Sequence, residues 1–173
     1  EEWHFRGFFT VLIGAVLLAE LRRGGGKQAV VNSAATFLGV LYIGWLGSHI
    51  GGLRELPRGF HRPYLEGMSF ALLPFALTWA CDTAAYVAGR AFGRTRLMPS
   101  VSPSKSVEGA VAGLLGSVAA AYGARAWFAP YLTPLDALAL GLFCGVFGQL
   151  GDLVESLLKR DAETKDSSRL IPG

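Results

Sequence analysis

Five long apolar segments, separated by short polar connections, set the pattern along this chain of 173 residues. They cover residues 7–21, 29–53, 68–89, 107–128 and 135–158. A helix needs about 20 apolar residues to cross a bilayer, so the pattern predicts an all-α, polytopic integral membrane protein. We expect about five transmembrane helices in one transmembrane domain over residues 1–173. The first segment is short, which leaves a tilted, truncated or re-entrant helix open.

Composition supports membrane helices over a soluble domain. Apolar residues make up 51% of the chain and charged residues 17%, against about a quarter charged in soluble domains. The alternative is a soluble, all-helical domain with unusually apolar helices. The net charge of +3 is modest, and basic residues lie between the apolar segments, which argues against nucleic-acid binding. Cys81 and Cys144 lie inside apolar segments, as packing residues do.

Basic residues predict the orientation of the helices. With five spans, 11 lie on one side and 5 on the other, and the richer side of a membrane protein is cytoplasmic. This places the connection over residues 90–106 and the segment over residues 159–173 in the cytoplasm. The richer side holds Arg22, Arg23, Lys27, Arg90, Arg94, Arg96, Lys105, Lys159, Arg160, Lys165 and Arg169, and the other side holds Arg6, Arg54, Arg58, Arg62 and Arg125.

Asp82 interrupts the third apolar segment, where an ionisable side chain is costly and indicates function by default. At 100° per residue, Thr78, Tyr86 and Gly89 share its helix face. A carboxylate, two hydroxyls and a small residue on one face favour a functional centre. A hydrogen-bonding cluster between helices is the alternative.

A denser polar face lies near the end of the fifth segment, where five side chains fall within an arc of about 120°. The carboxylates of Asp152 and Glu155 are hard oxygen ligands of the kind that suits Mg²⁺. Glu155 and Lys159 also have the i, i+4 spacing of an ion pair, so an ion-paired packing face is the alternative. The five residues are Gln149, Asp152, Glu155, Ser156 and Lys159.

The connection over residues 90–106 combines hydroxyls with basic side chains. Ser102 and Pro103 favour a turn, and Ser106 is suited to cap the fourth helix. Hydroxyls, Lys105 and free N–H groups at a helix N-terminus favour phosphate, so we interpret the connection as a cytoplasmic nucleotide-binding loop. Capping and solvation alone are the alternative. The sequence contains no Walker A motif.

Glycines in the fourth and fifth segments recur at small-xxx-small spacing, which permits close helix packing. We expect these two helices to pack tightly against each other and to bring the loop near Asp152. The glycines are Gly109, Gly113, Gly116, Gly141, Gly145, Gly148 and Gly151.

Three motifs together resemble the phosphatidate cytidylyltransferases, or CDP-diacylglycerol synthases. The first is Asp82-Thr83-Ala84-Ala85-Tyr86 with Gly89, Arg90 and Gly93. The second is Ser102-Pro103-Ser104-Lys105-Ser106 with Glu108 and Gly109, in which Ser106 replaces the usual Thr and Ser104 a common Lys. The third is Ser156-Leu157-Leu158-Lys159-Arg160 with Lys165, Asp166, Ser168, Ile171 and Pro172.

The resemblance covers residues 53–173 well and residues 1–52 in hydropathy alone. The family signature continues into His-Gly-Gly and Asp-Arg segments that would follow residue 173. We therefore expect the chain to be the C-terminal half of a longer enzyme that also has earlier helices and a last one. The isolated 173 residues are expected to be inactive, because part of the metal site would be missing.

The resemblance implies transfer of a cytidylyl group from CTP to phosphatidate, which gives CDP-diacylglycerol and pyrophosphate. It implies a Mg²⁺ site at Asp152, with Asp82 and Glu155 in the same centre, and a second cation such as K⁺ is left open. Residues implied for catalysis are Asp152, Asp82, Lys159, Arg160, Lys165 and Asp166. Residues implied for binding CTP or positioning the loop are Ser102, Lys105, Ser106, Glu108 and Ser156.

The implied partners are CTP, phosphatidate and the bilayer, with a homodimer left open. The implied location is the bacterial inner membrane, with the active site facing the cytoplasm. Three alternatives remain: a related CTP-using enzyme such as a CDP-archaeol synthase or lipid-alcohol kinase, a proton- or cation-coupled transporter, and a structural scaffold. The fixed spacing of Lys159, Arg160, Lys165 and Asp166 favours an enzyme, because transport does not require it.

Overall fold

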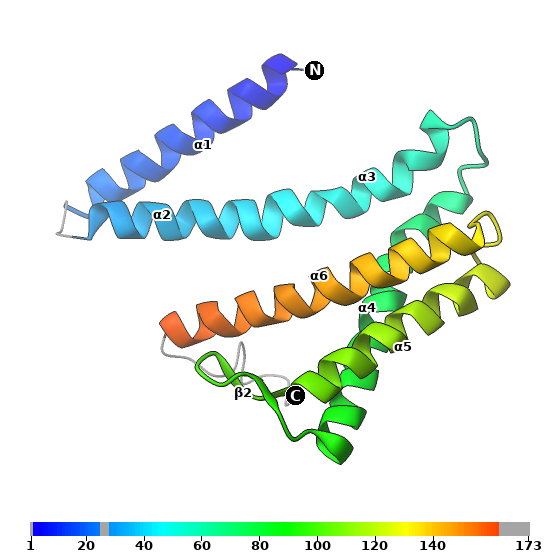
Figure 1. Cartoon of the computed structure of the whole chain (residues 1–173). Coiled ribbons are helices and arrows are strands. Elements are labelled where there is room, and N and C mark those ends of the chain that lie inside the picture. Colours follow the sequence, from blue (N-terminus) through cyan, green and yellow to red (C-terminus); the bar gives the residue numbers. More distant parts are fainter. Residues whose placement is uncertain (1, 25–27, 163–173) are drawn as a thin grey trace, which may run out of the picture. The chain divides into compact units, whose positions relative to one another are not determined.

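The computed structural model describes residues 2–24 and 28–162 as helices joined by short connections and one small hairpin (Figure 1). Within these residues, five helices are long and apolar enough to cross a membrane, which confirms the all-α, polytopic prediction. The elements in chain order are α1 (Glu2–Arg22), α2 (Ala29–Gly39), the π-helical η1 (Val40–Trp45), α3 (Leu46–Gly59), α4 (Glu66–Phe92), β1 (Arg96–Met98), β2 (Ser102–Ser106), α5 (Val107–Trp127) and α6 (Pro134–Asp161).

Four of the five predicted spans are longer than the apolar segments that predicted them, and the first two differ most. Helix α1 begins at Glu2 and has 21 residues, so it is long enough to cross a bilayer and the short first segment underestimated it. Helices α2, η1 and α3 form one continuous candidate span over Ala29–Gly59. The helical pattern therefore continues through the polar residues after Leu53, which the sequence had assigned to a connection.

Contacts divide the chain into two compact units, residues 1–53 and 54–173. The prediction of a single transmembrane domain over residues 1–173 stays a prediction. In the first unit, α1 contacts α2 at the buried carboxylate of Glu20, which accepts hydrogen bonds from Asn32 Nδ2 at 2.9 Å and Arg23 Nη1 at 3.3 Å. These partners satisfy a charge that would otherwise be costly to bury.

In the second unit, small residues allow α4, α5 and α6 to pack closely. A methyl group at Gly116 of α5 would lie 2.6 Å from Ala84 Cβ on α4, and one at Gly141 of α6 would lie 2.6 Å from Val118 Cα on α5. The α6 glycine meets α5 as expected. The α5 glycines face α4 instead, so the prediction that they pack against α6 was wrong. Glycine spacing along one helix shows that a close contact is possible but does not specify the partner helix.

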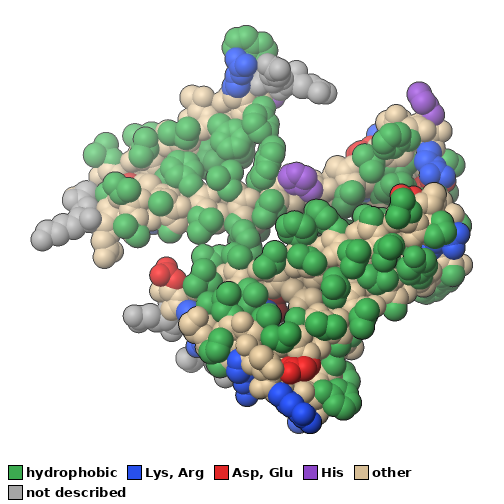
Figure 2. All heavy atoms as spheres, in the orientation of Figure 1, with side chains coloured by type: hydrophobic (Ala, Val, Ile, Leu, Met, Phe, Trp, Pro, Cys, Tyr) green, Lys and Arg blue, Asp and Glu red, His purple; other side chains and the backbone are tan. Residues whose placement is uncertain are grey.

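Charged side chains in the second unit gather near the helix ends, and apolar side chains cover much of the helix surface between them (Figure 2). Apolar helix surfaces of this kind are what lipid requires.

Thr133 and Asp136 form a capping box at the N-terminus of α6. The helix thus has a defined start.

The connection between α5 and α6 is fixed by Tyr131, whose ring stacks on Phe70 with a centroid separation of 4.6 Å. Ser69 Oγ donates to the Glu66 carbonyl at 2.6 Å, so the Tyr131 hydroxyl, 3.1 Å from Ser69 Oγ, is the donor between those two groups. Burial raises the pKa of the Tyr131 phenol above its ordinary value. The phenol therefore stays protonated, as this contact requires.

The connection between α4 and α5 forms an antiparallel hairpin at the end of the second unit where α4 and α6 end and α5 begins (Figure 1). Arg96 pairs with Ser106 and Met98 with Ser102, with an irregularity between the two pairs. Val107 N donates to the Thr95 carbonyl at 2.9 Å, which joins the hairpin to the first residue of α5. The sequence predicted a loop here, and the structure adds this short pair of strands.

Candidate active site

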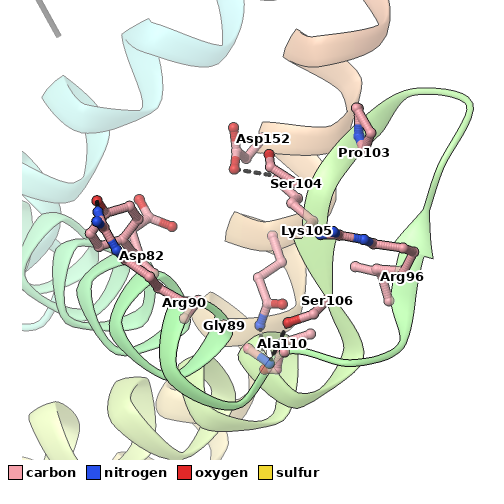
Figure 3. Close-up of a pocket in the computed structure, with 16 residues that line it drawn as sticks. Asp82, Gly89, Arg90, Arg96, Pro103, Ser104, Lys105, Ser106, Ala110 and Asp152 are labelled. Carbon is pink, nitrogen blue, oxygen red and sulfur yellow. Dashed lines mark hydrogen bonds and ion pairs between the residues drawn. The ribbon is translucent and has the colours of Figure 1, made fainter.

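A cavity of about 960 Å³ lies where α4, the hairpin, the start of α5 and α6 meet (Figure 3). All of these elements belong to the second unit. Its charged and amide-bearing lining residues come from four elements, namely Asp82 and Arg90 from α4, Arg96 from β1, Lys105 from β2, and Gln149 and Asp152 from α6. The cavity therefore joins residues that are as much as 70 positions apart in sequence.

Asp152 and Lys105 form an ion pair across this cavity, between α6 and β2. Asp82 lines the same cavity from α4. Figure 3 shows Asp152 and Lys105 on facing elements, with Asp82 on the neighbouring helix. The structure thus brings two of the carboxylates that the sequence picked out, Asp82 and Asp152, to one cavity with the lysine of the predicted nucleotide loop.

Ser106 anchors the hairpin to α5. The residue is 4% exposed, and its Oγ accepts a hydrogen bond from Gly109 N at 3.1 Å, which confirms the predicted N-cap. A methyl group at Gly109 would lie 2.8 Å from the Ala85 carbonyl oxygen, and one at Gly89 would lie 3.2 Å from Ser106 Oγ. Glycine at both positions lets α4 approach the start of α5, and this places Asp82 beside the hairpin.

Glu108 holds the turn between α4 and β1. Its carboxylate accepts hydrogen bonds from the backbone N–H of Arg94 at 3.1 Å and of Thr95 at 3.1 Å. Of the two roles the motif implied for Glu108, positioning of the loop is the one these contacts support. Glu108 does not line the cavity.

Gln149 connects α6 to α5 at the cavity wall. Its side-chain amide donates to the Ala110 carbonyl at 3.1 Å and to the Gly145 carbonyl at 3.0 Å. These bonds satisfy an amide that is partly buried among apolar helices. They also fix the part of α6 that carries Asp152, three residues further along.

Other residues implied for the site lie outside the cavity lining. Glu155 is 2.7 Å from Lys159 Nζ, the ion pair that the sequence left as an alternative. Neither residue lines the cavity, and the same is true of Ser102, Ser156 and Arg160. Lys165 and Asp166 lie outside the described residues. The roles assigned to these residues stay predictions.

Sequence reasoning left Arg96, Gln149, Tyr86 and Arg90 out of the site, although all four line the cavity. Arg90 and Arg96 lie within the predicted nucleotide-binding loop over residues 90–106, but neither was given a binding role of its own. Arg90 and Tyr86 fall inside the first motif, and Gln149 lies on the polar face of α6, so signals for these three were present. Arg96 stands outside every motif, and its placement depends on the strand pairing with Ser106.

The fold and the site together define a class: a polytopic membrane protein with a cavity of mixed charge at one end of its helices. Comparison with known sequences identifies the family. The sequence profile of the cytidylyltransferase family matches residues 2–173. The chain belongs to this family, which confirms the resemblance carried by the three motifs.

Several relatives named phosphatidate cytidylyltransferase are similar to this chain. One from Synechocystis is 36% identical over 191 residues, covering 98% of this chain and 64% of the relative. One from Staphylococcus epidermidis is 37% identical over 147 residues, covering 85% and 53%, and one from Staphylococcus haemolyticus is 31% identical over 163 residues, covering 94% and 59%. The chain thus spans between half and two thirds of the length of these relatives.

Proposed function

We propose that the protein transfers a cytidylyl group from CTP to phosphatidate, giving CDP-diacylglycerol and pyrophosphate. The observation that carries the proposal is the cavity in which Asp82, Asp152 and Lys105 meet at one end of the membrane helices. Membership of the cytidylyltransferase family and the name of the relatives support the reaction type. A membrane location suits the lipid substrate.

In this reaction a phosphate oxygen of phosphatidate attacks the α-phosphorus of CTP, and the bond from that phosphorus to the oxygen bridging to the β-phosphate breaks. Pyrophosphate leaves with the electron pair. Such transfers depend mainly on positioning and on neutralising charge. Lys105 is placed to hold a phosphate oxygen, since a lysine is a strong donor to phosphate, and the hairpin fixed at Ser106 and Glu108 positions it.

We extend the proposal to Mg²⁺. This ion is commonly held by one or two carboxylates together with substrate phosphates, and the donor pair of Asp82 and Asp152 fits that pattern. Among residues 2–24 and 28–162, no group of three or more His, Cys, Asp or Glu side chains comes together. Bound Mg²⁺ would supply charge neutralisation on the phosphates. A ligand role for Glu155 and a second cation such as K⁺ remain further parts of this prediction.

The proposed location is the bacterial inner membrane, with the cavity open to the cytoplasm, where CTP is present. One observation supports this orientation. The cavity lies at the end of the second unit that carries Arg90, Arg94, Arg96 and Lys105, and basic residues favour the cytoplasmic side. A homodimer stays a prediction.

The test is an assay of the full gene product, purified in detergent, with CTP and one of three acceptors: phosphatidate, an archaeal-type ether lipid phosphate, or a polyprenol. We expect pyrophosphate and CDP-diacylglycerol in equal amounts with phosphatidate. A lipid-alcohol kinase would instead release CDP and phosphorylate the polyprenol. A transporter would consume no CTP, and either result would contradict the proposal.

The same assay tests the metal. Removing divalent cations with EDTA should stop pyrophosphate release, and adding excess Mg²⁺ should restore it. Turnover that persists at full rate in EDTA would contradict the assignment of Asp82 and Asp152 as ligands while leaving the transfer reaction itself intact.

A further inference from the structure

We propose that Arg96 binds a phosphate group of a substrate in the cavity. The inference rests on the proposed function and assigns a residue that no motif in the sequence singles out. Phosphate is presented both by the triphosphate of CTP and by the headgroup of phosphatidate, so the chemistry of the ligand is shared between two sources. The experiment below separates them.

The first observation is the placement and pairing of the basic side chains. Three cationic residues line the cavity, namely Arg90, Arg96 and Lys105. Lys105 pairs with Asp152, and Arg90 Nη1 donates to the Tyr86 hydroxyl at 2.9 Å. Among the residues that the structure describes, the Arg96 guanidinium contacts no acceptor and no aromatic ring. No described residue therefore occupies the donors of this guanidinium.

The second observation is that the backbone around Arg96 is fixed on both sides. Arg96 pairs with Ser106, which caps α5. The preceding residue, Thr95, donates its N–H to Glu108 at 3.1 Å and accepts from Val107 N at 2.9 Å. A binding residue held in this way loses less conformational freedom when its ligand arrives.

The third observation is the direction of the side chain. Figure 3 shows Arg96 extending from β1 toward the region of Lys105, on the side of the cavity away from Asp82. A charge that only orients the helices has to lie on the cytoplasmic side, but its exact position there does not matter. Arg94 shows this contrast, since it lies two residues away and does not line the cavity.

The guanidinium also suits the ligand. Its planar fork of N–H donors matches two phosphate oxygens at once, whereas an ammonium group acts as a point charge. Two carboxylates and three cations line the cavity. If the carboxylates serve a metal ion, the cations remain to balance the charge of the substrate phosphates.

The experiment compares Arg96→Gln and Arg96→Lys with the matched control Arg94→Gln, all in the full gene product. Steady-state rates are measured while CTP is varied at saturating phosphatidate, and then while phosphatidate is varied at saturating CTP. Equilibrium binding of CTP and of inorganic pyrophosphate is measured separately, and thermal unfolding in detergent checks that each variant is folded.

We expect Arg96→Gln to raise KM for one of the two substrates by roughly tenfold or more, as loss of a charge-assisted hydrogen bond predicts. Arg96→Lys should recover part of this loss, and Arg94→Gln should leave both KM values unchanged. A rise in KM for CTP, with weaker binding of pyrophosphate, assigns Arg96 to the triphosphate. A rise in KM for phosphatidate alone assigns it to the lipid headgroup.

Unchanged KM values and unchanged binding in a folded Arg96→Gln protein would overturn the inference. The same changes in Arg94→Gln would also overturn it, because they would reflect the general charge of the hairpin. Failure of the proposed function would look different, since the unmodified protein would then release no pyrophosphate from CTP and phosphatidate.

Discussion

At the scale of the residue, Glu108 has the clearest positioning role. Its carboxylate accepts the N–H groups of Arg94 and Thr95 and so fixes the start of β1 against α5. We predict that Glu108→Ala loosens the hairpin and lowers kcat/KM for CTP by up to roughly a hundredfold, because small displacements of positioning groups have effects of that size. Glu108→Gln, which keeps one acceptor oxygen, should lose less.

Hydrogen exchange distinguishes this role from direct contact with substrate. The amides of Arg94 and Thr95 should exchange faster in Glu108→Ala than in the unmodified protein, in the absence of CTP. If these amides stay protected while activity falls, Glu108 acts on the substrate and the positioning role is wrong.

The sequence predicted single residues well where one chemical property was sufficient. Asp82 and Asp152 stood out because carboxylates are costly inside apolar segments, and Ser106 stood out because a hydroxyl caps a helix. Arg96 and Gln149 did not stand out as site residues. Their role depends on which strand or helix they face, and a basic residue in a loop is equally consistent with a topological signal.

At the scale of the element, the contact between α4 and α5 depends on glycine. A methyl group at Gly116 would lie 2.6 Å from Ala84 Cβ, whereas one at Gly123 on the same helix would have no described atom within 4 Å. We predict that Gly116→Ala destabilises the protein by about 1–3 kcal/mol, as overpacking does. Gly123→Ala should be neutral or slightly stabilising, because alanine favours a helix more than glycine.

Thermal unfolding in detergent measures both variants. Equal midpoints for Gly116→Ala and Gly123→Ala would contradict the close approach of the two helices. Activity adds a second comparison, since movement of α4 would displace Asp82 from the cavity and the Gly116 variant alone should lose turnover.

Element boundaries and partners were the less predictable part of the fold. The five spans follow from apolar length, but β1 and β2 lack the alternation of apolar and polar residues that marks a strand. Their pairing is stabilised by contacts of Thr95 with Val107 and Glu108 on α5. Tertiary contacts determine both the pairing of the two strands and the helix against which the α5 glycines pack. The sequence of one segment does not contain this information.

At the scale of the whole molecule, the distribution of charge predicts how the second unit crosses the membrane. The hairpin at residues 93–106 lies at one end of its helices, and the α5–α6 connection at residues 128–133 lies at the other end. We predict that Ser100→Cys in the hairpin is inaccessible to a membrane-impermeant thiol reagent in spheroplasts, which lack the outer membrane, and becomes labelled after lysis. Pro130→Cys should be labelled in spheroplasts.

The native Cys81 and Cys144 lie within helices α4 and α6, so the unmodified protein provides the background for this measurement. Labelling of Ser100→Cys, and protection of Pro130→Cys, in spheroplasts would place the cavity on the opposite side and contradict access of cytoplasmic CTP.

The central claim is that the cavity around Asp152 carries the cytidylyl transfer. The most direct measurement is Mg²⁺-dependent release of pyrophosphate from CTP and phosphatidate by the full gene product and by its Asp152→Asn variant. Asp161→Asn, at the exposed end of α6 and outside the cavity lining, is the matched control. We predict that Asp152→Asn lowers the rate by roughly a hundredfold or more and that Asp161→Asn keeps it. Near-normal turnover in a folded Asp152→Asn protein would contradict the account.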